Sequence, residues 1–418
     1  MNLIIHRGAH EIGGSCVEVN SKGSSLLMDL GLPLETEPGR ADPDLVPQTL
    51  TERLNNGTRF LGLLLTHAHP DHYGLAGCLP ESIKRYCGKG TAALLDLAHR
   101  LRPTLDPAVN HQTFDPGRPL FIGPFKVTPF LMDHSIFDAY GFLIEAEGKS
   151  LFYTGDFRGH GRKPYTIRNL ADNVSSVDVL LMEGTLLGGQ EDRAAVSENE
   201  LLEEFWKSFK ETKGTALVSL SSTNIDRLVT IYKAARRAGR MLVVDFYQAE
   251  LLERLGEFAK IPQASWDGLK VCYPQTLARR FERLGLKDIL TRHRVNGLGW
   301  KKIESLKEKI VMSVRPGYEG DLSRFESLDG GIWIYSLWKG YLDKSNPWAA
   351  FKLFLEEKGV PIKYIHTSGH ADLAALRLMV EALSPKKIVP IHSAKGEWFV
   401  DIFKNVFLLN DGVTMEIN

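Results

Sequence analysis

Short apolar and alternating segments dominate the first 190 residues and are separated by glycine and turn residues, which is typical of β-strands. The expected strands are 2–6, 16–20, 26–30, 60–65, 119–122, 126–130, 140–145, 150–153 and 177–182. A helical pattern at 91–101 falls among them. Strands mixed with helices in this way predict an α/β sandwich, in which helices cover sheets that are partly antiparallel.

The pattern changes at Ser197, which lies three residues before Glu200 and just ahead of an apolar run. This capping-box signature predicts the start of a helix. Strand and helix then alternate, which predicts a parallel sheet. The expected elements are strands at 215–220, 241–245 and 332–337 and helices at 224–238, 250–259 and 347–358.

The last fifty-odd residues return to a strand–helix–strand pattern, and no repeat or low-complexity linker divides the chain. We therefore expect the middle segment to be an insertion into one fold. The expected organisation is a first domain made of 1–194 and 364–418, with an inserted domain at 195–363.

Composition narrows the class of protein. A hydrophobic fraction of 43% and a charged fraction of 24% are those of a globular protein and exclude a disordered or collagen-like chain. The 51 basic residues balance the 51 acidic ones, which argues against a uniformly basic nucleic-acid binder but permits a local basic surface. No signal-peptide pattern and no apolar run of ~18 residues is present, so we expect a cytoplasmic protein that does not contact a membrane.

The most informative string is T-H-A-H-P-D-H at 66–72, directly after the apolar strand expected at 60–65. Four metal-competent side chains fall within six positions: His67, His69, Asp71 and His72. We expect them on a turn that folds back on itself, because neither a helix face nor a strand face would bring all four together. Imidazole and carboxylate ligands without a thiolate suit zinc, or less selectively manganese, iron or cobalt.

Two further candidate ligands follow expected strands. His134 comes after the strand at 126–130, and Asp156 comes after the strand at 150–153. Each alone could be an ordinary polar loop residue. Because a sandwich can aim side chains from several strand ends at one rim, we expect both to join the 66–72 string.

Taken in order, Asp29, the 66–72 string, His134 and Asp156 resemble the ordered motifs of the metallo-β-lactamase superfamily. The resemblance implies a four-layer αββα sandwich with two Zn²⁺ ions on one edge, Mn²⁺ being the alternative. It implies that His67, His69 and His134 hold the first metal, that Asp71 and His72 hold the second, and that Asp156 bridges them. Asp29 would steady the ligand loop.

Three later residues resemble motifs A, B and C of the β-CASP nucleases: Glu183 in L-M-E-G-T, His370 in S-G-H-A and His392 in V-P-I-H. The string S-S-T-N at 221–224 is similar to the start of the inserted domain in ribonuclease J-like members. The resemblance therefore implies that the inserted segment is a β-CASP α/β domain.

The implied activity is hydrolysis of phosphodiester bonds in RNA, endonucleolytic or 5′-exonucleolytic, by hydroxide that two zinc ions activate. Asp71, Glu183 and His370 are the expected catalytic residues. His370 would protonate the leaving oxygen, Glu183 would orient His370, and His392 would complete the shell of the second metal. A histidine at motif C accompanies the RNA-processing members, so His392 favours RNA over DNA.

Hydroxyl and amide side chains can position phosphates without reading sequence, and Ser222, Asn224 and Ser368 are the expected substrate-binding residues. Capping of a helix is the alternative for Asn224. The expected partner is single-stranded RNA, with DNA as the alternative, and a homodimer is left open.

Between Arg279 and Lys309 ten basic residues stand against four acidic ones. This excess is either a solvated helical face or a basic surface that guides a polyanion. Three other functions also remain open for the chain: a β-CASP DNA nuclease, a metallo-hydrolase of lactones or thioesters, and a non-catalytic RNA-binding subunit.

Overall fold

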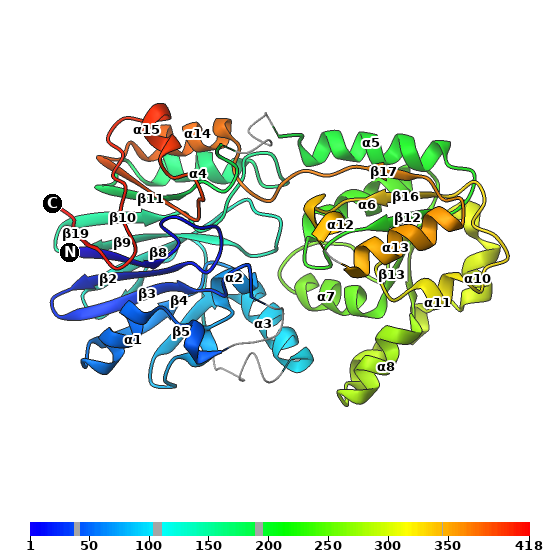
Figure 1. The fold of residues 1–418 in the computed structure, drawn as a ribbon, viewed down its shortest axis with the longest axis horizontal. Helices are drawn as coiled ribbons and strands as arrows, with labels where there is room; N and C mark the ends of the chain where they lie inside the picture. Colours follow the sequence, from blue (N-terminus) through cyan, green and yellow to red (C-terminus); the bar gives the residue numbers. More distant parts are fainter. Residues whose placement is uncertain (37–41, 103–110, 189–194, 345) are drawn as a thin grey trace. The chain divides into compact units, whose positions relative to one another are not determined.

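The protein is described by a computed structural model that covers residues 1–36, 42–102, 111–188, 195–344 and 346–418 (Figure 1). The chain folds into two compact units. The first unit combines 1–195 with 369–418, and the second unit consists of 196–368. The first unit is thus built from two separate stretches of chain, with the second unit between them in sequence.

Two sheets form the centre of the first unit. The strands of the first sheet lie in the order β19-β1-β2-β3-β4-β5-β6; they are β1 (Asn2–Arg7), β2 (Cys16–Ser21), β3 (Ser24–Leu30), β4 (Arg59–Leu64), β5 (Lys84–Gly88), β6 (His111–Phe114) and β19 (Thr414–Glu416). The second sheet has the order β18-β11-β10-β9-β8-β7; its strands are β7 (Leu120–Ile122), β8 (Phe125–Leu131), β9 (Tyr140–Ala146), β10 (Lys149–Tyr153), β11 (Val179–Glu183) and β18 (Lys387–Ile391).

Three apolar clusters hold four layers together. The cluster between the sheets joins residues such as Leu26 and Met28 of the first sheet to Phe142 and Leu181 of the second. A second cluster packs the first sheet against α1 (Gln48–Asn55), α2 (Pro70–Tyr73) and α3 (Lys89–Leu101). A third packs the second sheet against α4 (Tyr165–Asn173), α14 (Leu373–Leu383) and α15 (Trp398–Ile402). The expected αββα sandwich is therefore confirmed.

Strand direction brings several loops of the second sheet to one edge. Strands β10, β11 and β18 are mutually parallel. Strand β8 has the same direction as β10, since both are antiparallel to β9. The segments that follow β8, β10, β11 and β18 consequently leave the sheet at the same edge.

The second unit contains a parallel sheet with the strand order β14-β13-β15-β12-β16-β17. Its strands are β12 (Ala216–Ser219), β13 (Met241–Asp245), β14 (Leu269–Cys272), β15 (Ile310–Ser313), β16 (Ile332–Tyr335) and β17 (Ile362–Tyr364). The helices around it are α5 (Glu198–Glu211), α6 (Ile225–Arg237), α7 (Phe246–Gly256), α8 (Gln275–Arg283), α9 (Lys287–Arg292), α10 (Trp300–Ser305), α11 (Glu319–Leu322), α12 (Gly340–Lys344) and α13 (Asn346–Glu357). Leu217, Met312 and Trp333 are buried in its core.

The helix predicted at 250–259 begins earlier, at Phe246. Asp245 ends strand β13 and also caps α7, because its side chain accepts a hydrogen bond from the backbone N–H of Gln248 while Gln248 bonds back to Asp245. The strand pattern at 241–245 therefore runs directly into the helix. Within the described residues, no helix is both long enough and apolar enough to cross a bilayer.

Candidate metal centre

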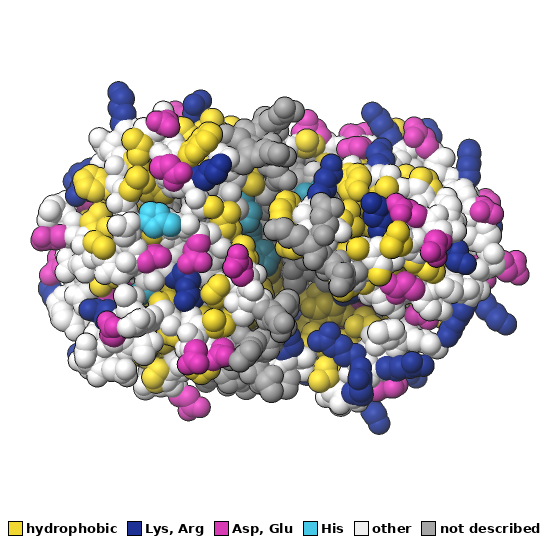
Figure 2. All heavy atoms as spheres, in the orientation of Figure 1, with side chains coloured by type: hydrophobic (Ala, Val, Ile, Leu, Met, Phe, Trp, Pro, Cys, Tyr) yellow, Lys and Arg dark blue, Asp and Glu magenta, His cyan; other side chains and the backbone are white. Residues whose placement is uncertain are grey.

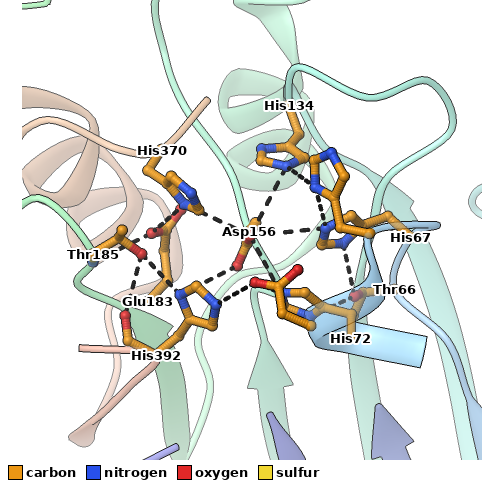
Figure 3. A network of polar contacts seen from close by, with 12 residues as sticks. Thr66, His67, His72, His134, Asp156, Glu183, Thr185, His370 and His392 are labelled. Atoms are coloured by element: carbon orange, nitrogen blue, oxygen red, sulfur yellow. Dashed lines mark hydrogen bonds and ion pairs between the residues drawn. The ribbon is translucent and has the colours of Figure 1, made fainter. Parts of the chain in front are cut away.

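The metal-competent side chains of the first unit converge at one edge of its sandwich. His67 and His69 lie in the loop after β4, whereas Asp71 and His72 lie in α2. The remaining members follow β8, β10 and β18, end β11 or precede α14; they are His134, Asp156, His392, Glu183 and His370. Figure 3 shows Asp156 in the middle of this group.

The first potential ligand group consists of three imidazoles and one carboxylate, His67, His69, His134 and Asp156. His69 Nδ1 lies 3.0 Å from His67 Nε2 and 3.1 Å from His134 Nε2. Asp156 Oδ2 lies 3.8 Å from His67 Nε2 and 3.9 Å from His134 Nε2. Ligands of a tetrahedral zinc ion are about 3.4 Å apart when each bond is about 2.1 Å, so these four atoms fit such an ion.

The second potential ligand group contains Asp71, His72 and His392. Asp71 Oδ2 lies 3.3 Å from His392 Nε2 and 3.9 Å from His72 Nε2. Asp156 Oδ2 adjoins this group as well, at 3.2 Å from His72 Nε2. The same carboxylate therefore faces both groups.

Two buried atoms in this cluster are incompletely satisfied. Among the described residues, Asp156 Oδ1 has no hydrogen-bond partner, and His72 Nε2 has only the Asp156 carboxylate beside it, without a well-formed hydrogen bond. Leaving such groups unsatisfied in the interior costs about 1–3 kcal/mol each. A cation between the two groups would satisfy them, so the donor set and its orphaned atoms fit a metal site.

Other side chains orient the rings. Asp29 is fully buried, and its carboxylate lies 2.8 Å from His72 Nδ1. The same carboxylate accepts hydrogen bonds from the Thr66 backbone N–H at 2.8 Å and from the Tyr153 hydroxyl at 2.9 Å. His134 Nδ1 lies 2.6 Å from the Gly369 carbonyl oxygen. An Nδ1–H that donates to these oxygens leaves Nε2 of each ring free for a metal.

The backbone around α2 requires close contact with the first sheet. A Cβ atom on Gly31 would lie 1.7 Å from the Asp71 carbonyl oxygen, so only glycine fits there. Asp71 and His72 are part of a short helix, and the prediction of a turn was wrong for this pair. Pro70 occupies the first helical turn, where its missing N–H costs nothing.

Burial and charge give the cluster an uneven protonation pattern. Burial lowers the pKa of His67 and His134 well below the usual value and that of His69 to about 4. Burial opposes ionisation of Asp156, but His392 and His72 outweigh it and lower the pKa of this carboxyl group. Neutral imidazoles beside an ionised carboxylate are the forms that bind metal.

His72 differs from the other imidazoles. Burial would lower its pKa, but Asp156 and Asp29 outweigh that effect and raise the pKa well above the usual value. In the metal-free chain His72 therefore carries a proton that a metal ion must displace.

His370 and Glu183 form a pair beside the ligand groups (Figure 3). His370 Nδ1 lies 3.1 Å from Glu183 Oε2 and 3.6 Å from Asp156 Oδ2. Burial would lower the pKa of His370, but Glu183 and Asp156 raise it to about 9. The His370 side chain is 23% exposed and that of Glu183 only 1%, so of the two only the imidazole can reach a bound molecule.

The predicted substrate-binding residues lie in the second unit. Asn224 caps α6, since its side-chain oxygen accepts a hydrogen bond from the Arg227 backbone N–H at 2.9 Å. Ser222 lies in the turn before that cap, and Ser368 immediately precedes Gly369 in the chain. Their substrate contacts remain predictions.

Sequence reasoning missed three supporting hydroxyl groups. Thr66 Oγ1 lies 3.0 Å from His67 Nδ1, Thr185 Oγ1 lies 2.8 Å from His392 Nδ1, and the Tyr153 hydroxyl bonds Asp29. The positions of Thr66 beside a ligand and of Thr185 two residues after Glu183 were the available signals. Nothing in the local pattern indicates that Tyr153 contacts Asp29, which is 124 residues away in sequence.

Comparison with known proteins agrees with this geometry. The family model of the beta-lactamase superfamily domain matches residues 40–219. The model of the Zn-dependent metallo-hydrolase RNA specificity domain matches residues 359–397, a segment that contains His370 and His392. The chain is similar to proteins of the metallo-β-lactamase/β-CASP type, ribonuclease J among them.

Several curated relatives match almost the entire length of this chain. It is 22% identical to "Ribonuclease J" of Helicobacter pylori, with 98% of this chain and 60% of that protein aligned. It is 21% identical to "Ribonuclease J" of Mycoplasma genitalium (92% and 66%) and 22% identical to "Ribonuclease J 2" of Streptococcus pyogenes (100% and 76%). The chain spans about 60% of the length of the first of these relatives.

A solved structure shares the fold. The crystal structure of a protein of unknown function from Enterococcus faecalis V583 superposes with a TM-score of 0.78 at 20% identity. The match covers 99% of both chains. The fold of this chain therefore has a counterpart among solved structures.

Proposed function

We propose that this protein hydrolyses phosphodiester bonds in RNA with two divalent metal ions, most simply Zn²⁺. The observation that carries the proposal is the placement of Asp156 Oδ2 within 3.2–3.9 Å of imidazole nitrogens from both ligand groups. A single carboxylate that faces two groups of potential metal ligands suits a site for two metal ions.

The residues divide between two ions. His67, His69 and His134 would hold one ion, and Asp71, His72 and His392 the other, with Asp156 shared by both. Such ions, when bound, polarise a phosphoryl oxygen and lower the pKa of a coordinated water towards ~7. Mn²⁺ is the alternative occupant, because the donor set contains no thiolate.

His370 would protonate the leaving oxygen of the cleaved bond. Its Nδ1 faces Glu183, which leaves Nε2–H to donate. Glu183 is a positioning residue, held by the backbone N–H of Phe157, which donates to Oε1 at 2.8 Å. Since the imidazole has a pKa of about 9 in the metal-free chain, it can carry the required proton at neutral pH.

RNA is the proposed substrate for two reasons. The matched RNA specificity domain spans the segment that supplies His370 and His392, and the relatives are named for ribonuclease activity. Neither reason decides between endonucleolytic and 5′-exonucleolytic cleavage. The nature of the 5′ end should therefore be varied in the test.

The test is a substrate panel with zinc-reloaded protein. End-labelled RNA carrying a 5′-monophosphate or a 5′-triphosphate, DNA of the same sequence, a lactone and a thioester are incubated separately. We expect RNA cleavage to exceed the rate on every other substrate. A preference for the 5′-monophosphate would indicate exonucleolytic end recognition, and equal internal cleavage of both RNAs would indicate an endonuclease.

The same panel can reject the proposal. Hydrolysis of the lactone or thioester without RNA cleavage would assign a small-molecule hydrolase. Preferential cleavage of DNA would assign a DNA nuclease. RNA binding without cleavage of any substrate would assign a non-catalytic subunit.

A further inference from the structure

A dense group of basic side chains lies on α8, α9, α10 and the turns beside them in the second unit. We name this group the α8–α10 surface. Its members are all exposed and are Arg279, Arg280, Arg283, Lys287, Arg294, Lys301, Lys302 and Lys309. In Figure 2, Lys and Arg side chains gather over α8.

These helices bury their apolar sides and thereby present the basic ones. Phe281 is the buried residue of α8, and its ring packs edge-on against Phe246 at 4.9 Å between centroids. Ile289 and Leu290 anchor α9, and Ile303 anchors α10. The basic positions are thus held outward by a fixed apolar base.

The α8–α10 surface is not neutralised by its own acidic neighbours. None of its eight side chains forms an ion pair or hydrogen bond with any residue that the structure describes. Of the acidic residues nearby, Asp288 lies 3.9 Å from Arg292, and the Glu304 carboxylate accepts a hydrogen bond from the Glu326 backbone N–H. Arg279 interacts electrostatically with Asp321, but the basic residues of the segment 279–309 outnumber its acidic ones, so the surface keeps a net positive charge.

Several basic residues elsewhere in the second unit are paired with carboxylates. Arg236 lies 2.7 Å from Asp267, Arg237 forms an ion pair with Glu203, and Lys363 lies 3.5 Å from Glu204. Local pairing is therefore available in this fold. Its absence from the described α8–α10 surface leaves positive charge for an external polyanion.

We propose that the α8–α10 surface binds the phosphate backbone of single-stranded RNA beyond the nucleotides at the reacting centre. This inference rests on the proposed function, which supplies a polyanion with a regular repeat of charge. Arginine and lysine contacts to phosphate carry no sequence information. The surface would therefore strengthen binding of long substrates in general without selecting a sequence.

The experiment compares two variants of zinc-reloaded protein with equal charge loss. The test variant carries Arg279→Gln, Arg280→Gln, Arg283→Gln and Lys287→Gln. The control variant carries Lys207→Gln, Lys210→Gln, Lys260→Gln and Lys358→Gln, which are exposed positions of the same unit. Binding of a hydrolysis-resistant phosphorothioate RNA 20-mer is measured by fluorescence anisotropy from 50 to 300 mM salt.

Each lost phosphate contact should reduce the slope of log K against log salt by about 0.7 for a single strand. We therefore expect the magnitude of this slope to be smaller than the parental one by about two to three in the test variant and by less than about one in the control variant. An equal slope in the test variant and the parent would overturn the proposal. Displacement of the RNA by polyglutamate at equal charge concentration would also overturn it, in favour of an acidic protein partner.

Failure of this inference is separable from failure of the proposed function. Both variants should hydrolyse the small phosphodiester bis(4-nitrophenyl) phosphate at the parental rate, because that substrate has no extended phosphate backbone for the α8–α10 surface to bind. If the test variant keeps the parental salt slope and the protein cleaves RNA, the proposed role of the α8–α10 surface is wrong and the proposed function stands. If the unsubstituted protein cleaves neither RNA nor the small phosphodiester, the proposed function itself is wrong.

Discussion

Two buried polar clusters, one in each unit, differ in how many of their polar atoms have a hydrogen-bond partner within the cluster. In the second unit, Glu198 accepts hydrogen bonds from Arg227 Nη2 at 2.9 Å and from Thr230 Oγ1 at 2.6 Å. Arg227 also bonds the hydroxyl of Ser336. In the first unit, the cluster around Asp156 leaves buried atoms without a hydrogen bond among the described residues.

The difference is the one we expect between a structural cluster and a cluster that binds a metal. The Glu198–Arg227 pair is complete, since a cation and an anion of the same chain match each other. The Asp156 cluster gathers imidazoles around carboxylates, and among the described residues Asp156 Oδ1 has no hydrogen-bond partner. Such a cluster suits a divalent metal ion, which has the charge and geometry to complete it.

Removal of a proposed ligand should have the largest effect. Asp71→Ala is expected to lower RNA cleavage at least ~10³-fold, because metal stabilisation of transition-state charge is worth several kcal/mol. Zinc content by mass spectrometry should fall with it. Asp115→Ala, at an exposed carboxylate bonded to Lys89, is the control and should keep both. Full activity of Asp71→Ala would contradict the dinuclear assignment.

Removal of the proposed acid should leave the metal in place. His370→Ala is expected to reduce kcat by about 10²–10⁴-fold with unchanged zinc content. As the pH rises, the parental rate should begin to fall near pH 9 or earlier, because His370 then loses the proton that it must donate. Its pKa is about 9 in the metal-free chain, and bound cations would disfavour the imidazolium and lower this value. The rate of the variant should not decrease in this way at high pH. A variant with the parental pH profile would exclude His370 as the acid.

Breaking the complete cluster should affect stability instead of chemistry. Glu198→Gln leaves the Arg227 guanidinium buried without its charge partner, and both side chains are 0% exposed. A loss of about 3–5 kcal/mol in the stability of the second unit is expected by urea denaturation, with zinc content retained. Glu203→Gln on the same helix removes an exposed partner of Arg237 and should cost less than about 1 kcal/mol. Equal effects of the two substitutions would contradict the contrast.

The smallest effect is expected for a residue that contacts a proposed ligand but does not itself bind the metal. Asp29 has a left-handed backbone with φ +55°, a conformation that Asn also tolerates. Asp29→Asn should therefore fold and weaken zinc binding by about 10–100-fold, measured by competition with a chelating dye. Parental zinc affinity in this variant would mean that the contact with His72 does not tune the site.

The parts of the fold that could be predicted are those with local signals. The apolar run at 60–65 corresponds to β4, and the 66–72 string that follows places its four metal-competent residues together because they are near neighbours in sequence. The capping box at Ser197 correctly predicts the start of α5. Hydrophobic pattern and capping chemistry are sufficient in these segments.

Other features depend on contacts between distant residues. The short strands β5, β6, β14 and β15 were missed, because four or five residues with few alternating positions give no clear period. Thr185 reaches His392 across 207 residues, and Tyr153 reaches Asp29 across 124. Only the packing of the sheets brings these pairs together, so the hydroxyl groups that support the ligands could not be predicted from spacing.

The most direct test of the central claim is titration of the metal-stripped protein with zinc while cleavage of end-labelled RNA is followed. Activity should be absent without metal, should rise with added zinc, and should reach its plateau at two equivalents per chain, because Asp156 faces two ligand groups. Undiminished RNA cleavage by the stripped protein, or a plateau at one equivalent, would contradict the account.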